Sequence, residues 1–152
     1  MGGRDSGGSY SNVIDYVTIA NTGNATDFGN LTESKGYVYT ANNTTRGIRM
    51  GGQTDTNVMD YITMASAGNA TDFGDLTAST GSNYMNVVHN ATYAWMAQYS
   101  TLEIGKQKIT MASAGNATSI TDGSGPFGTE ILNMIDAPQS QSMVPGWIAA
   151  TG

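Results

Sequence analysis

Cysteine is absent from this 152-residue chain, which excludes a disulfide framework, a thiolate metal site and a thiol nucleophile. Charge is also scarce, because only 12% of the residues are charged and six Lys and Arg stand against twelve Asp and Glu. Contacts with phosphates need a basic face, so the net charge of -6 predicts that the chain does not bind nucleic acid. No apolar run approaches the roughly 18 to 20 residues of a membrane span, and no membrane partner is expected.

Groups suited to acid–base catalysis are few. His89 is the single histidine, and the chain holds only three glutamates. Neither a nucleophile elbow nor the spacing of a catalytic triad surrounds His89, so a surface or turn position is the preferred interpretation. Side-chain catalysis needs a positioned acid, base or nucleophile. The sequence therefore predicts a protein that is not an enzyme, with no catalytic residue and no cofactor.

Small and turn-forming residues are abundant instead. Glycine and threonine contribute 20 residues each, and asparagine and serine contribute 13 each. Hydrophobic residues still make up 39% of the chain, which is enough for a folded core. This composition favours a β-rich domain with many turns.

An internal repeat is the strongest pattern. Residues 12–31 read NVIDYVTIANTGNATDFGNL and residues 57–76 read NVMDYITMASAGNATDFGDL, at a spacing of 45. A partial third copy, ITMASAGNAT, occupies residues 109–118. In it, SITD replaces the DFGDL that follows in the second copy. The chain therefore carries three imperfect copies of one unit.

Each copy is expected to contain a β-hairpin. Residues 58–64 alternate in the period of two that is typical of a strand, and residues 13–19 are their equivalents. Gly68 and Asn69 predict the turn, with residues 71–77 as the partner strand. Residues 84–88 and 91–99 are two further β-prone runs, which makes about four short strands per unit.

Landmarks in the first two units resemble those of kelch-like repeats, whereas the third unit lacks the Gly-Gly pair and the second aromatic residue. Gly51 and Gly52 are followed by Tyr61 and then by Phe73, although the family usually has Trp at the last position. The resemblance implies an all-β fold of four-stranded units at about residues 1–49, 50–96 and 97–128, within one repeat domain over residues 1–128. Propellers usually close with four to eight such blades. The expectation is thus a partial β-propeller, or one completed by oligomerisation.

The wording of the repeat resembles that of kelch-like virion surface proteins from marine tailed bacteriophages, especially cyanophages. YITMASAGNATDFGDLT, preceded by TTRGIRMGG, carries this resemblance. It implies a non-enzymatic structural protein on the virion surface, a capsid knob or decoration protein. The alternative is a tail-fibre or receptor-binding subunit that recognises host glycan. A third hypothesis is a polysaccharide depolymerase with a carboxylate pair such as Asp60 and Asp75.

Two further kinds of binding site are compatible with the sequence, but structural roles explain the same residues. Repeated acids suggest calcium, but no contiguous calcium-loop pattern is present, and strand or turn roles with no metal are preferred. Asp15 and Asp60 are expected on an exposed strand face. Aromatic residues could stack on sugars, although core packing is the preferred interpretation. The acids are Asp15, Asp27, Asp60, Asp72 and Asp75, and the aromatics are Tyr37, Tyr39, Tyr93, Trp95, Tyr99 and Trp147.

The C-terminal residues 129–152 depart from the repeat and predict an irregular arm. Met143, Val144 and Trp147 are isolated hydrophobic residues in a polar stretch, which suits a segment that lies on a neighbouring protein. The alternative is a strap across the chain's own sheets. The expected partners are other copies of the chain, the major capsid protein or tail proteins, with host glycan as a possible ligand.

Overall fold

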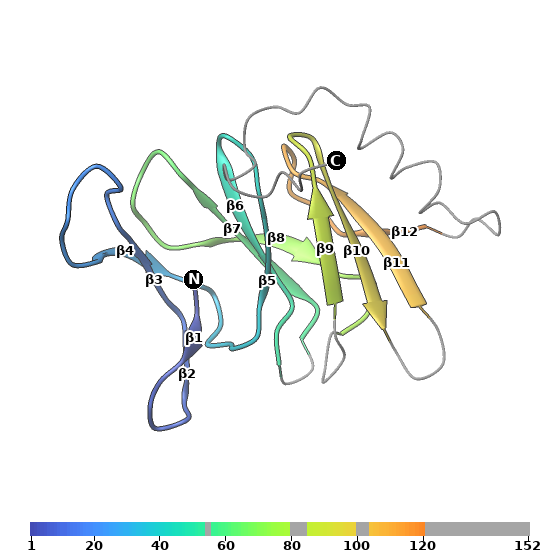
Figure 1. The fold of residues 1–152 in the computed structure, drawn as a ribbon. Helices are drawn as coiled ribbons and strands as arrows, with labels where there is room; N and C mark the ends of the chain where they lie inside the picture. Colours follow the sequence, from blue (N-terminus) through green and yellow to red (C-terminus); the bar gives the residue numbers. More distant parts are fainter. Residues whose placement is uncertain (54–55, 80–84, 100–103, 121–152) are drawn as a thin grey trace, which may run out of the picture.

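A computed structural model describes residues 1–53, 56–79, 85–99 and 104–120. Within these ranges the chain forms twelve β-strands and no helix (Figure 1). The predicted all-β class is therefore confirmed. All strand pairs are antiparallel, which agrees with short strands joined by turns rather than by helical crossovers.

Two four-stranded sheets form the larger part of the fold. The first, in the order β5-β6-β7-β8, contains β5 (Tyr39–Asn42), β6 (Arg46–Met50), β7 (Val58–Thr63) and β8 (Thr71–Asp75). The second, in the order β12-β11-β10-β9, contains β9 (Met85–His89), β10 (Tyr93–Tyr99), β11 (Ile104–Thr110) and β12 (Thr118–Ser119). Two-stranded sheets pair β1 (Gly3–Arg4) with β2 (Tyr10–Ser11), and β3 (Val13–Tyr16) with β4 (Thr26–Asn30).

The first two copies of the repeat fold alike. Strands β3 and β7 start at equivalent residues, and each pairs with the strand that the next part of its copy forms, β4 or β8. A β-bulge follows Ile14 in β3 and Met59 in β7, so even the irregularity is repeated. The predicted equivalence of these two hairpins is confirmed.

The main core lies between the two four-stranded sheets. Each strand from β5 to β11 contributes at least one buried hydrophobic side chain, and these side chains meet in one cluster. Met59 of β7 and Met96 of β10 are among the fully buried members. The whole cluster comprises Ala41, Ile48, Met50, Met59, Phe73, Leu76, Met85, Ala94, Met96, Ile109 and Met111.

The boundaries of the four-stranded sheets do not coincide with those of the repeated sequence. The repeated phrase in the second copy forms the last two strands of its sheet, while β5 and β6 come from the residues before it. The first copy contributes only β3 and β4 to a sheet. Met1 occupies the position in the first copy that Met50, the last residue of β6, occupies in the second. The hydrogen bonds that follow are equivalent: Gly2 N–H donates to Val13 O at 2.9 Å, and Gly51 N–H donates to Val58 O at 3.0 Å. The described residues form no closed propeller.

Candidate functional site

The loop between β7 and β8 binds the neighbouring hairpin. Gly68 N–H donates to Phe28 O at 2.7 Å, and Ala70 N–H donates to Asn30 O at 2.8 Å. Asn30 N–H in turn donates to Asn69 Oδ1 at 3.0 Å. The expectation of a tight turn at Gly68 and Asn69 was therefore wrong. These residues extend along the edge of β4 because its free carbonyl and amide groups need partners.

The third copy repeats this junction on β8. Gly115 N–H donates to Phe73 O at 2.6 Å, and Ala117 N–H donates to Asp75 O at 2.8 Å. Asp75 N–H donates to Asn116 Oδ1 at 3.0 Å. The Gly-Asn-Ala phrase of one copy thus binds the Phe-Gly-Asn/Asp strand of the copy before it. In Figure 1 the β7–β8 loop reaches toward β4.

Both receiving strands need glycine at the point of contact. Gly29 in β4 has φ 147° and Gly74 in β8 has φ 131°, values that side-chain-bearing residues rarely adopt. A Cβ atom on Gly29 would stand 2.3 Å from Gly68 O, and one on Gly74 would stand 2.6 Å from Gly115 O. The third copy has Thr121 at the equivalent position.

Asp60 forms the polar centre of the first junction. Its carboxylate accepts hydrogen bonds from the hydroxyl and the N–H group of Thr32 and forms a buried ion pair with Arg49. Arg49 also donates to Gly51 O at 2.9 Å and lies 3.8 Å from a carboxylate oxygen of Glu33. Asp60 is 0% exposed, so the expectation of an exposed strand face was wrong. The neighbouring hairpin covers it.

Gln107 takes the place of Asp60 in the second junction. Its Oε1 accepts from Thr77 N–H at 2.8 Å and from Thr77 Oγ1 at 3.0 Å. Thr77 is the repeat equivalent of Thr32. A neutral amide and a carboxylate thus serve the same role in the two junctions.

The other repeated acids do not gather into a metal site. Asp15 is exposed as expected, and Asp72 accepts from Gly74 N–H at 3.3 Å within β8. The described residues hold no group of three or more His, Cys, Asp or Glu that could bind a metal ion. The carboxylate of Asp60 and the backbone of Asp75 both take part in junctions between copies.

His89 and the candidate aromatic residues lie in different parts of the fold and differ in burial. His89 ends β9 and is half-buried, with no hydrogen-bond partner at Nδ1 among the described residues. Tyr39 accepts from Met85 N–H at 2.9 Å and packs on the core, while Tyr37 is exposed. Tyr93 and Trp95 form one ring pair, with centroids 5.6 Å apart. The side chain of Tyr99 and all of Trp147 lie outside the described part of the chain.

The hydrophobic residues of the predicted arm, Met143, Val144 and Trp147, lie outside the described residues, as does the rest of the segment 129–152. Their interaction role stays a prediction.

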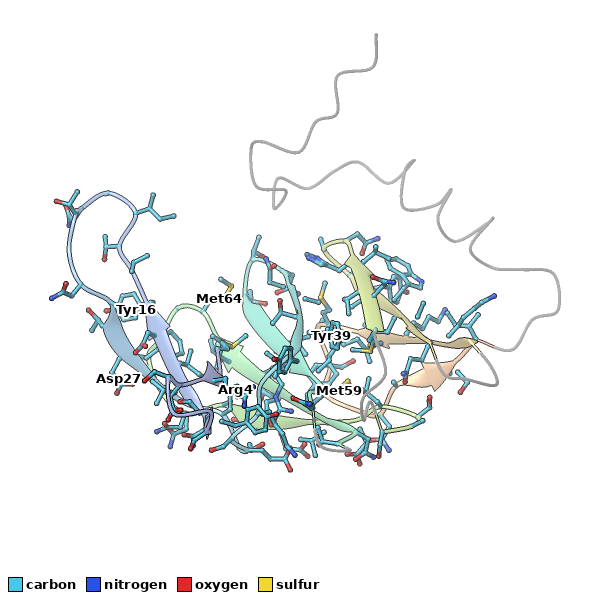
Figure 2. The ribbon with its side chains drawn as sticks, turned by 60° about the horizontal axis from the view of Figure 1, so that its bottom comes forward. Arg4, Tyr16, Asp27, Tyr39, Met59 and Met64 are labelled. Atoms are coloured by element: carbon cyan, nitrogen blue, oxygen red, sulfur yellow. The ribbon has the colours of Figure 1, made fainter. Side chains whose placement is uncertain are left out.

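An open pocket of about 680 Å³ separates the β3–β4 hairpin from β5, β6 and β7. Ile14, Tyr16 and Phe28 line one side, and Ala41 and Ile62 line the other. Tyr16 and Phe28 meet edge to face with centroids 6.1 Å apart, as Tyr61 and Phe73 do at 6.0 Å. In the second copy, side chains of β5 and β6 complete the same layer. The pocket lies where the β3–β4 hairpin has no counterparts of β5 and β6. Tyr16, which lines it, is labelled in Figure 2.

Comparison with known protein families finds no family model that matches the chain, and comparison with curated proteins finds no significant match. The part of the chain that the structure describes contains no helix long and apolar enough to cross a membrane.

The hydrogen bond between Asn116 and Asp75 can be tested by substitution, with the equivalent residue of the first copy as the control. Replacing Asn116 with alanine removes the acceptor for Asp75 N–H, and we expect it to lower the free energy of unfolding by about 1 kcal/mol. Asn24 is the equivalent residue of the first copy and forms no hydrogen bond to another copy within the part of the chain that the structure describes. Asn24→Ala should therefore change stability by less than about 0.5 kcal/mol. Urea denaturation followed by tryptophan fluorescence measures both. Equal losses in the two variants would contradict the junction.

Proposed function

We propose that this protein is a non-enzymatic structural protein of a bacteriophage virion surface, a capsid knob or decoration protein built from kelch-like units. The resemblance of the repeat phrase to such proteins supports the proposal. A second support is the architecture, in which successive β-units bind edge to edge through repeated contacts. Such an arrangement presents a regular surface without needing a reactive centre.

The observation that best supports a structural role is that Asp60 of the second copy and Gln107 of the third occupy equivalent positions and make equivalent contacts. Both side chains accept hydrogen bonds from a threonine of the preceding copy. Glutamine cannot act as a general acid or base, whereas it can accept the same two hydrogen bonds. Contacts between copies therefore account for the residue at this position of the repeat. Both carboxylate oxygens of Asp60 already accept hydrogen bonds, which argues against a catalytic carboxylate pair that includes Asp60.

In this proposal the units form part of a propeller that other molecules complete. The β3–β4 hairpin has no inner strands among the described residues, and the pocket beside it is open and lined by hydrophobic side chains. Unfilled sheet edges favour association. The proposed partners are further copies of the chain, the major capsid protein or tail proteins.

Electron cryo-microscopy of phage particles that carry the protein tests the location. We expect density for the chain on the head surface, and antibody labelling of the same particles should decorate heads. Density confined to the tail tip would overturn the capsid proposal in favour of a receptor-binding subunit that recognises host glycan. Absence of the protein from purified, intact particles would contradict both.

A further inference from the structure

The first copy carries the corresponding loop, and among the described residues no strand pairs with it. Residues 21–25 read Asn-Thr-Gly-Asn-Ala, in the place of the loops that bind β4 and β8. No hydrogen bond joins Gly23, Asn24 or Ala25 to another copy among the described residues. The loop points away from β5–β8 at the end of the row of strands (Figure 1).

The two occupied junctions define what such a loop binds. In each, the Gly N–H donates to a Phe carbonyl, the Ala N–H donates to an Asn or Asp carbonyl, and the Asn side chain accepts from the same Asn or Asp N–H. In each, the residue equivalent to Asp60 also accepts from a Thr hydroxyl and N–H. The same set of contacts occurs twice, at β4 and at β8.

The first copy presents all four equivalents to solvent. Asp15, Gly23, Asn24 and Ala25 are exposed, and we call them together the free docking face. The hydrophobic residue Ile19 is 99% exposed, whereas its equivalents in the two docked copies, Met64 and Met111, are 50% and 0% exposed.

We propose that the free docking face binds an edge strand of a partner protein with the sequence Phe-Gly-(Asn or Asp)-Leu-Thr. The partner's Phe carbonyl would accept from Gly23 N–H, and its Asn or Asp would pair with Asn24 and Ala25. Its threonine would donate to Asp15. This inference goes beyond the proposed function and holds for any partner that bears such a strand.

The close approach of the two backbones requires glycine in the partner strand. A Cβ atom there would stand 2.3 to 2.6 Å from the loop's Gly carbonyl, as at Gly29 and Gly74. In a second copy of this chain, β4 and β8 are already occupied by that copy's own loops. Its third repeat has Thr121 instead of the glycine. A partner strand that has glycine at this position and a free edge meets both requirements.

A tethered peptide tests this directly on the full chain. The probe is Thr-Asp-Phe-Gly-Asp-Leu-Thr, fused to the N-terminus through a flexible Gly/Ser linker of about 15 residues, which holds it at about millimolar effective concentration. If its Kd is about 0.1 mM, the exchange of the Gly23 and Ala25 amides with water should slow by about tenfold. NMR measurement of amide exchange reports each residue separately.

Two matched controls decide the outcome. A fusion with Val in place of the peptide's Gly should leave the exchange of both amides unchanged, because the added side chain meets the loop backbone. The Asn24→Ala variant of the glycine fusion should lose most of the protection. Equal exchange rates for Gly23 and Ala25 in the glycine and valine fusions would overturn the proposal, as would protection confined to other residues. Neither result depends on where the protein lies on a virion.

Discussion

Replacing Asp60 with alanine should lower the free energy of unfolding by about 3 kcal/mol. Its partner Arg49 has a side chain that is 0% exposed, and the substitution leaves this cation without its closest carboxylate. Thr32 also loses its acceptor, so the contact between the first hairpin and the first four-stranded sheet weakens. Urea denaturation of the variant and of the natural chain measures the difference.

Asp15 is the matched control, since it is the repeat equivalent of Asp60 but is exposed. Asp15→Ala should change the stability by less than about 0.5 kcal/mol. The double variant Arg49→Met/Asp60→Leu should recover most of the loss, because a buried ion pair is often replaceable by apolar side chains of similar volume. Equal effects of Asp15→Ala and Asp60→Ala would show that the buried pair does not join the copies.

Replacing Gly74 with alanine should cost about 3 kcal/mol, from two causes. The φ of 131° is strained for a residue with a Cβ, and that Cβ would stand 2.6 Å from both the carbonyl carbon and the oxygen of Gly115. The loop of the third copy would have to leave β8. Thermal and urea denaturation measure the stability, and amide exchange at Gly115 and Ala117 reports the loss of the two hydrogen bonds.

Gly68→Ala provides the comparison in the same repeat. Gly68 belongs to a docked loop, but nothing stands within 4 Å of a Cβ built on it. Its replacement should therefore cost less than about 1 kcal/mol. If Gly74→Ala were as mild as Gly68→Ala, close backbone contact would not be what holds the second and third copies together.

The free docking face could be found only by comparing equivalent residues in space. Gly23, Gly68 and Gly115 look alike in the sequence, and the alternation of the flanking residues favours a simple hairpin turn for all three. The receiving strands, by contrast, do have a signal in the sequence. The strand glycine occurs in the two copies that another copy follows, and Thr121 replaces it in the third.

The sequence by itself determined the all-β class, the equivalence of β3 with β7, and the strands within residues 84–99. These features depend on local patterns, namely a side-chain period of two and turn-forming residues between strands. The burial of Asp60 and the exposure of Asp15 could not be predicted in this way, since both occupy the same place in the same phrase. Only the tertiary structure decided them, because burial depends on whether a neighbouring copy covers the strand. The same reason separates the bound loops at Gly68 and Gly115 from the free one at Gly23.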